Sequence, residues 1–363
     1  MRKHYLDNIR WITVVIVVFY HVVYMYNAAG VVGGLGNITG MEMQPIDAFM
    51  YFVYPWFMPV LFLISGMSSR FYLDAHSEKD FVKSRTVKLL VPSTIGLFTF
   101  QFIQGYVSMS FGDAFSALDG LVPKPVIFLI MVASGSGVLW FIHLLWIYSM
   151  ILLLVRKIEK GRLLSAGAKT PVWMIVLFTI PIWGCAQILN VPVPPVYRIG
   201  FYFSFFMLGY YVFSNDEVME KLKRCAGVLI FIGVAASVAF TVLYFIMYNE
   251  MNYADKPVNR GILYTMAAYF GSLAMLSGMA RFGDFSNAFT EWMSKKSWGL
   301  YVFHYLGISS VALFIAKKGL LPAPMCYLLS LLAGFVFGYG LYAIISRIPI
   351  YRWTVLGIRG DKV

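Results

Sequence analysis

The chain has 363 residues, of which 60% are hydrophobic and only 13% are charged. Because a typical soluble domain carries about 25% charged residues, this composition excludes an ordinary soluble protein and indicates a polytopic membrane protein. The formal net charge of +12 points to no nucleic acid partner, since the positions of the basic residues follow a membrane topology, as set out below.

The hydrophobic runs predict an all-α fold, a polytopic membrane helical bundle of about ten transmembrane helices that forms a single domain over residues 1–363. The runs are too long and too continuous for the strands of a barrel. In chain order they cover residues 11–26, 47–67, 89–109, 138–155, 172–189, 199–213, 226–248, 261–280, 297–316 and 325–346. Pro55 and Pro59 predict a kink in the second span, and Pro181 predicts one in the fifth. A shorter apolar piece at 126–132 is a candidate for a segment that enters the membrane without crossing it.

The basic residues predict that the N- and C-termini are both cytoplasmic. With the N-terminus inside, 23 of the 29 Lys and Arg residues fall in cytoplasmic segments. The other six fall in outer segments: Lys124, Arg198, Lys256, Arg260, Lys317 and Lys318. None falls inside a span, which supports the count of ten. We therefore expect a multi-pass protein of the plasma membrane, surrounded by the lipid bilayer.

The first span carries two ionisable residues, Arg10 at its cytoplasmic start and His21 deep inside it. They are eleven positions apart, which is about 20° more than three helical turns, so both side chains lie on one face with a rise of about 16 Å between them. His21 is thus expected near the middle of the membrane, where an ionisable side chain usually faces a bundle interior or a cavity. The alternative is a buried histidine that only hydrogen-bonds a neighbouring helix.

Two further histidines and one carboxylate are candidates for the same site. We interpret His143, in the fourth span, as a packing residue. His304 lies about 10 Å below the cytoplasmic surface, at a depth that a pocket entered from that side would reach, although a satisfied core histidine is the alternative. Among the outer acidic residues, Asp47 is the first candidate to assist His21, because it begins the span that follows the His21 helix.

A basic pair, Arg85 and Lys88, lies at the cytoplasmic start of the third span. Three positions apart on a helix, the two side chains share a face. Arginine can grip a phosphate with two parallel hydrogen bonds, whereas lysine offers a point charge. The pair is therefore a candidate anion site, and the alternative is that both charges only set the topology.

The sequence holds no other pattern that carries chemistry. It has no Ser–His–Asp order, no G-x-S-x-G elbow and no metal-ligand spacing, so we expect no metal cofactor. The three cysteines, Cys185, Cys225 and Cys326, form no framework of disulfides.

Blocks of sequence spread over nearly the whole chain carry a family resemblance. The most specific is YLDNIRWITVVIVVFYH, in which ten residues separate Arg10 from His21. The others are FLISGM at 62–67, FVKSRTVKLLVP at 81–92, LWFIHLL at 139–145, FYFSFFMLGYYVF at 201–213, MSKKSWGLYVFHYLG at 293–307 and the closing IPIYRWTVLG. In this order the blocks resemble the acyltransferase 3 family of integral-membrane O-acyltransferases. One departure is Lys88, where the family usually has a second arginine, so that one bidentate fork is lost.

The resemblance implies an enzyme that moves an acyl group from cytoplasmic acyl-CoA to a hydroxyl of an extracytoplasmic carbohydrate or glycan. The phosphates of the donor would meet the basic residues, and its thioester would reach His21, which acts as general base or as acyl carrier. The expected catalytic residues are His21, Arg10 and Asp47, and the expected donor-binding residues are Arg85, Lys88 and His304.

Several alternatives stay open at this point. Acetyl-CoA is the first candidate donor, but the LDNIRW start and the loop YMYNAAGVVGGLG resemble a branch that includes glucan-modifying succinyltransferases. The loops name no particular sugar, and the oligomeric state is not readable. A proton-coupled transporter of a sugar or small polar solute is the alternative function, because kinked helices with a midplane histidine also describe such carriers.

Overall fold

The computed structural model describes residues 3–191 and 197–359, and most of these residues are helical. The chain forms two compact units, each assembled from three separate stretches of sequence. Unit 1 comprises Met1–Thr13, Ala48–Lys83 and Ile147–Ser294, and unit 2 comprises Val14–Asp47, Ser84–Trp146 and Lys295–Val363. Three long helices begin in one unit and end in the other: α1 (His4–Met25), α8 (Trp140–Glu159) and α17 (Ala288–Val311).

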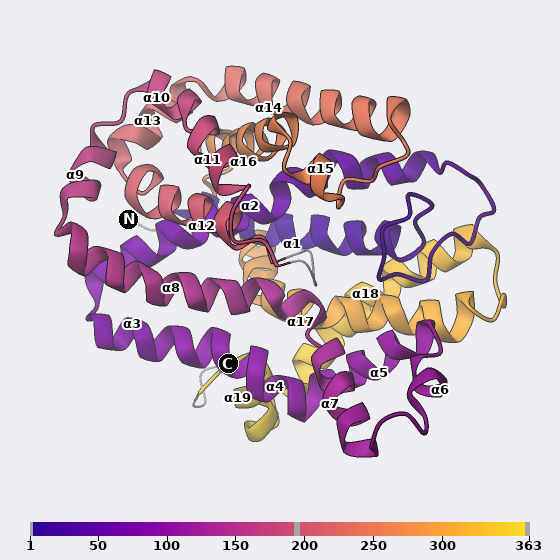
Figure 1. Cartoon of the computed structure of the whole chain (residues 1–363). Coiled ribbons are helices and arrows are strands. Elements are labelled where there is room, and N and C mark those ends of the chain that lie inside the picture. Colours follow the sequence, from indigo (N-terminus) through magenta and orange to yellow (C-terminus); the bar gives the residue numbers. More distant parts are fainter. Residues whose placement is uncertain (1–2, 192–196, 360–363) are drawn as a thin grey trace. The chain divides into compact units, whose positions relative to one another are not determined.

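Unit 1 is a bundle built around α2 (Ala48–Ala75), which is apolar on all sides and largely buried as a result. Two helices pack against it, α12 (Ile199–Leu208) and α16 (Ile262–Phe282), and α14 (Ala226–Thr241) lies along α16 (Figure 1). A π turn continues α12. The other elements are α3 (Glu78–Arg85), α9 (Arg162–Ala168), α10 (Val172–Leu177), α11 (Thr179–Cys185), α13 (Asp216–Arg224), α15 (Lys256–Asn259) and the π turns Gly209–Phe213 and Val242–Met247.

Unit 2 contains a second set of packed helices. α5 (Phe102–Phe111) packs against α7 (Lys124–Ser134), and α19 (Pro349–Leu356) packs against α4 (Val91–Gly96). A buried bond from the amide of Gln104 to the hydroxyl of Ser309, at 3.1 Å, ties α5 to α17. The other elements are α6 (Ala114–Leu118), α18 (Ala323–Ile345), the 3-10 turns Pro45–Asp47 and Gly137–Leu139, and the π turns Thr86–Leu90, Leu97–Gln101 and Ala312–Ala316.

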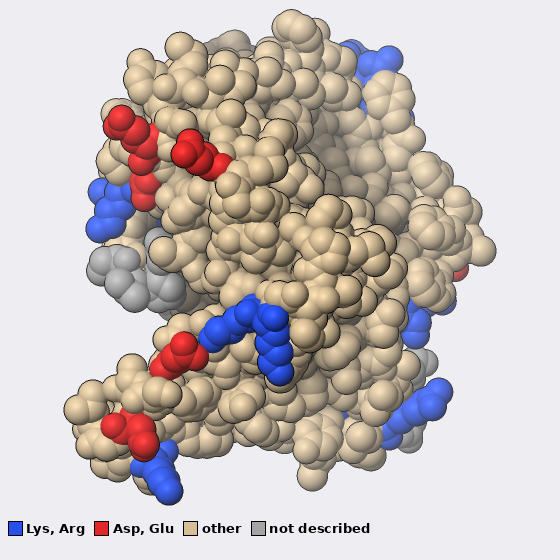
Figure 2. Space-filling model, turned by 90° about the vertical axis from the view of Figure 1, so that its right-hand side faces the viewer, with Lys and Arg blue, Asp and Glu red and all other residues tan. Residues whose placement is uncertain are grey.

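Within the described residues, eight helical segments are long and apolar enough to cross a membrane, so the chain is a multi-pass membrane protein. They are His4–Met25, Pro45–Ala75, Glu78–Phe111, Gly137–Glu159, Ala226–Met247, Ile262–Phe282, Ala288–Ala316 and Ala323–Ile345. Uncharged side chains make up most of the surface in Figure 2, as expected for a membrane protein. The predicted span at 199–213 and the short segment predicted at 126–132 are apolar helices of less than spanning length, Ile199–Phe213 and Lys124–Ser134.

The span predicted at 172–189 takes a different form from a simple kinked helix. It belongs to a bent pair, Arg162–Ala168 and Val172–Cys185, whose axes turn by 115°. The second helix is interrupted again at Phe178, which leaves Pro181 in the first turn of α11, where its missing N–H has no helical partner to lose. By contrast, α2 remains one helix through both of its prolines.

Glycine allows α2 and the α12 segment to approach closely. A Cβ on Gly66 would lie 2.0 Å from the carbonyl oxygen of Phe206, and a Cβ on Gly209 would lie 2.0 Å from that of Leu63. Inside a membrane, packing of small residues rather than the hydrophobic effect drives helix association. The two glycines therefore set the distance between these helices.

Replacing Gly66 with alanine is expected to destabilise the protein, because the new methyl group must push backbone atoms apart. Overpacking of this kind typically costs about 1–3 kcal/mol. Thermal unfolding in detergent should show a lower midpoint for Gly66→Ala. The matched control is Gly227→Ala on α14, where a Cβ meets nothing within 4 Å. If both variants unfold at the wild-type temperature, the close contact at Gly66 is wrong.

Candidate functional site

His21 and His304 form a hydrogen-bonded pair within unit 2. His21 lies on α1 and His304 on α17. Nε2 of His304 is 3.1 Å from Nδ1 of His21, and the ring centroids are 5.1 Å apart. His304 is fully buried, whereas His21 keeps part of its surface accessible. The structure thus joins the midplane histidine expected from the sequence to a second imidazole.

The surrounding carbonyl groups determine which nitrogen of each neutral ring carries the proton. Nδ1 of His304 lies 2.8 Å from the carbonyl oxygen of Leu300 and 3.0 Å from that of Tyr301. Since a carbonyl only accepts, Nδ1 of His304 is the donor and its Nε2 is an acceptor. Nδ1 of His21 therefore donates, both to that acceptor and to the carbonyl oxygen of Val17 at 2.9 Å. The lone pair of His21 is left on Nε2.

Three tyrosine rings flank the imidazole of His21. The ring centroids of Tyr20, Tyr24 and Tyr305 lie 5.1, 5.9 and 5.0 Å from that of His21, all in edge-to-face geometry. This geometry is the one that aromatic quadrupoles favour. The rings hold the imidazole and restrict the directions from which another molecule can approach it. Sequence reasoning missed these tyrosines, although the three-residue spacing from His21 to Tyr24 on a helix was an available signal.

The glycine-rich loop after α1 is fastened to two of these tyrosines. The hydroxyl of Tyr24 donates to the carbonyl oxygen of Val32 at 2.6 Å, and that of Tyr305 donates to the carbonyl oxygen of Gly33 at 3.3 Å. Gly33 has φ of +112°, and a Cβ there would lie 2.1 Å from the hydroxyl oxygen of Tyr24. The positive φ and the contact with Tyr24 together explain the glycine at position 33.

Asp47, an expected catalytic residue, is fully buried in the 3-10 turn Pro45–Asp47. Its Oδ2 accepts the N–H of Ala28 at 2.8 Å. Its Oδ1 has no hydrogen-bond partner among residues 3–191 and 197–359, and within the same residues it makes no bond to His21. Asp47 therefore closes the loop between α1 and α2, and its assistance to His21 stays a prediction.

Arg10 lies on the same unbroken helix as His21, in the part of α1 that belongs to unit 1. Its guanidinium pairs with Asp7 at 2.8 Å and reaches the hydroxyl of Ser68 at 3.5 Å. The side chain is 41% exposed, and an ion pair with that exposure contributes little to stability. Because a guanidinium has five N–H donors, Arg10 retains the capacity to bind an anion.

The basic pair, Arg85 and Lys88, lies where α3 ends and a π turn begins. Arg85 is the last residue of α3, and Lys88 lies in the π turn Thr86–Leu90. The prediction that the two side chains share a face assumed regular α-helical spacing, which does not hold across a π turn. Lys88 is exposed and Arg85 is partly buried. The indole of Trp146 donates to the hydroxyl of Thr86 at 3.2 Å and anchors the turn.

His143 lies away from the histidine pair in sequence and belongs to a different helix. His143 lies on α8 beside the backbone of Ser93 in unit 2, a position compatible with the packing role expected for it. Across the described part of the chain, no group of three or more His, Cys, Asp or Glu residues is placed to hold a metal ion.

Comparison with known proteins identifies a family. A family model described as an acyltransferase domain matches residues 3–346, which is nearly the whole chain. The histidine pair, Arg10, Asp47 and the basic pair all lie within the matched region. No curated protein and no solved structure matches the chain.

Both histidines are expected to carry the proton of their neutral ring on Nδ1. Solid-state NMR of the ¹⁵N-histidine-labelled protein in lipid should show a protonated Nδ1 and an unprotonated Nε2 for each of them. The variants His21→Gln and His304→Gln assign the signals. A protonated Nε2 on neutral His21 would contradict the arrangement derived from the carbonyl positions.

Proposed function

The chain belongs to the acyltransferase family, and from this premise we propose that it transfers an acyl group from cytoplasmic acyl-CoA to a hydroxyl of a carbohydrate on the other side of the plasma membrane. Family and spans make it a multi-pass membrane acyltransferase. The donor, the acceptor and the role of histidine are our proposal. Acetyl-CoA is the first candidate donor, with succinyl-CoA as the variant.

The observation that carries the proposal is the direction of the lone pair on His21. Nδ1 is engaged by Val17 and His304, so the basic nitrogen is Nε2, on a residue that is not fully buried. A base of this kind must be within hydrogen-bond reach of the proton that it removes. An acceptor hydroxyl that donates to Nε2 meets this condition without any rearrangement of the histidine pair.

The transfer then proceeds in two steps through a tetrahedral adduct. Nε2 of His21 takes the hydroxyl proton while the acceptor oxygen bonds to the thioester carbonyl carbon. The carbon–sulfur bond then breaks, and the CoA thiolate leaves and receives the proton from the imidazolium. The variant is attack by Nε2 itself on the thioester, which gives an acyl-imidazole that the hydroxyl then resolves.

His304 is best explained as a positioning residue. The sequence places it among the donor-binding residues, but it is fully buried and both of its ring nitrogens are engaged. No nitrogen is left for the donor. By accepting the N–H of His21, His304 orients the base, as a third group does in other base–nucleophile pairs. It also stabilises the imidazolium that forms during transfer.

The basic pair at the junction of α3 and the π turn Thr86–Leu90 suits the donor. CoA carries several phosphate charges at one end, and Arg85 and Lys88, both in unit 2 with His21, offer one guanidinium group and one ammonium group. A guanidinium binds phosphate through paired hydrogen bonds, and the exposed Lys88 adds a point charge. We therefore propose Arg85 and Lys88 for the phosphates, and Asp47, which has one unpaired oxygen, as the carboxylate that assists His21.

Replacing His21 with alanine is expected to abolish acyl transfer, because a general base contributes about 10²–10⁴-fold to rate. The measurement is release of free CoA from acetyl-CoA in the presence of a glycan extract, with purified protein in detergent. His76→Ala, an exposed histidine outside the site, is the matched control. Transfer at more than about a tenth of the wild-type rate by a folded His21→Ala protein would refute the role.

Replacing Arg85 with alanine is expected to raise the KM for acyl-CoA by roughly tenfold or more and to leave kcat little changed, because a hydrogen bond to a charged group is worth about 1.5–3 kcal/mol. Lys83→Ala removes an exposed cation from the same helix and serves as control. Equal KM values for the two variants would place the phosphates of the donor elsewhere.

A further inference from the structure

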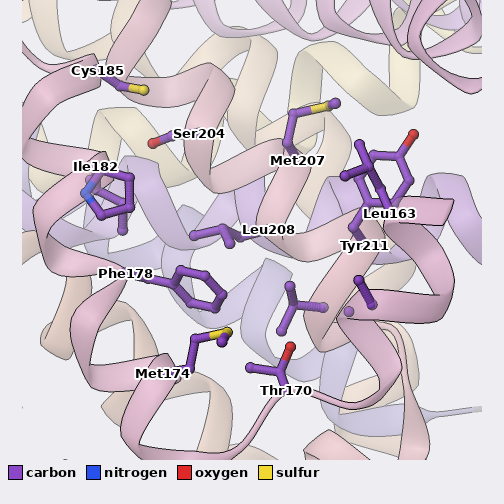
Figure 3. A pocket seen from close by; sticks show the side chains of 14 residues that line it. Leu163, Thr170, Met174, Phe178, Ile182, Cys185, Ser204, Met207, Leu208 and Tyr211 are labelled. Atoms are coloured by element: carbon purple, nitrogen blue, oxygen red, sulfur yellow. The ribbon is translucent and has the colours of Figure 1, made fainter. Parts of the chain in front are cut away.

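A cavity of about 410 Å³ opens in unit 1 beside the bent pair of helices. Its walls come from α9, α10, α11, α12 and the π turn Gly209–Phe213 (Figure 3). Most of the side chains that form them are apolar: Leu163, Met174, Phe178, Ile182, Met207 and Leu208. The volume lies in the range of ligand pockets, roughly 300–1,000 Å³. None of these residues takes part in the proposed acyl transfer.

The cavity exists because the chain packs tightly on one side of it and bends sharply on another. Gly167 of α9 touches the π turn directly, since a Cβ there would lie 2.0 Å from the carbonyl oxygen of Tyr211. After α9 the chain passes Lys169 and Thr170 and reaches Pro171, the N-cap of α10, and the helix axis turns by 115°. The bend carries α10 and α11 off the line of α9, so the space between them and α12 is only partly filled.

The cavity has few polar groups, and one of them is poorly hydrogen-bonded. The hydroxyl of Ser204 donates to the carbonyl oxygen of Phe201 at 2.7 Å. Tyr211 is only 6% exposed, and its hydroxyl makes no hydrogen bond of normal geometry among the described residues, although the carboxylate of Glu159 lies beside it. A buried hydroxyl without a well-formed hydrogen bond is destabilising. A bound molecule with an acceptor oxygen at this wall would relieve it.

Thr170 lines one end of the cavity (Figure 3), and two lysines lie close to it in the structure or in the sequence. The ammonium group of Lys221 donates to the carbonyl oxygen of Thr170 at 3.2 Å. Lys169, one residue earlier, is exposed. The positive-inside pattern places both residues on the cytoplasmic side.

The start of α9 adds a third cation. Arg162 is exposed and precedes Leu163, which lines the cavity. The carboxylate of Glu159 accepts the backbone N–H of Leu163 at 2.9 Å and so caps α9. Over α9, the flanking Lys169 and Glu159, and α13, the basic side chains (Arg162, Lys169, Lys221, Lys223 and Arg224) outnumber the carboxylates (Glu159, Asp216, Glu217 and Glu220) by one.

We infer that this cavity holds an acyl chain of an anionic glycerophospholipid, with the lipid phosphate against Arg162, Lys169 and Lys221. The apolar walls match hydrocarbon, whereas a sugar or a peptide would leave polar groups facing them without partners. A zwitterionic lipid would fill the cavity but gain less from the cations. An ester or phosphate oxygen of the lipid accepts from Tyr211. The inference stands apart from the proposed acyl transfer.

The first test compares lipids on the delipidated protein by native mass spectrometry, with phosphatidylglycerol and phosphatidylcholine of equal chain length. The wild type is expected to retain one phosphatidylglycerol roughly tenfold more tightly than phosphatidylcholine. In Arg162→Gln with Lys169→Gln this preference should fall close to equality. The control is Lys157→Gln with Arg224→Gln, which removes the same charge from two other exposed positions and should keep the preference.

The second test locates the lipid. Cys185 lines the cavity (Figure 3), and the two other cysteines are Cys225 and Cys326. In a Cys225→Ser, Cys326→Ala background, an apolar maleimide should modify Cys185 several-fold more slowly when phosphatidylglycerol is present than after delipidation. Leu208→Trp, which fills the cavity, should slow labelling without any lipid.

The two tests address the headgroup and the acyl chain of the lipid separately. Equal retention of the two lipids by the wild type, or an unchanged preference in Arg162→Gln with Lys169→Gln, overturns the anionic headgroup. Labelling of Cys185 that ignores phosphatidylglycerol overturns the cavity as the place of the acyl chain. Loss of the preference in the charge variant together with protection of Cys185 supports both parts.

Discussion

The hydrogen bond between the imidazoles of His21 and His304 is the interaction on which the candidate site depends. Each ring is also held by the carbonyl group four positions earlier on its own helix, Val17 for one and Leu300 for the other. A helical carbonyl already accepts one backbone N–H and has a second lone pair to offer. The two helices therefore impose the proton positions with their own backbone, and the direction of the basic nitrogen follows from helix geometry.

Elsewhere, irregular stretches of helix form the basic pair, a helix contact and the wall of the cavity. One π turn contains Lys88, and another follows α12 where it contacts α2. A bend of 115° between helices forms one wall of the cavity in unit 1. Arg198 is another unusual feature, because it is a buried basic residue. It is 2% exposed and lies over the ring of Phe201, 4.1 Å from its centroid. A cation–π contact of this kind stabilises a guanidinium away from water.

Much of the fold could be predicted from the sequence, because hydropathy and basic residues report directly on a membrane. Eight of the ten predicted spans, within the described residues, and the family followed from local patterns. The partner of His21 could not be predicted, since His304 is 283 positions away and a lone histidine in a span has no visible partner. The burial of Arg198 could not be predicted either, because the distribution of basic residues indicates the side of the membrane on which a residue lies and not the side chains that it contacts. The bend before α10 was not predicted, because the sequence indicated a kink at Pro181 within a single span instead.

The loop contacts of the two phenols have a consequence for how charge is stabilised during transfer. Tyr24 and Tyr305 each own a single hydroxyl proton, and each donates it to a carbonyl of the loop after α1. Neither can then serve as an oxyanion-hole donor while the loop is in place. The negative oxygen of a tetrahedral adduct needs donors aimed at it, so these must come from other groups, or the loop must release a phenol when the acceptor arrives.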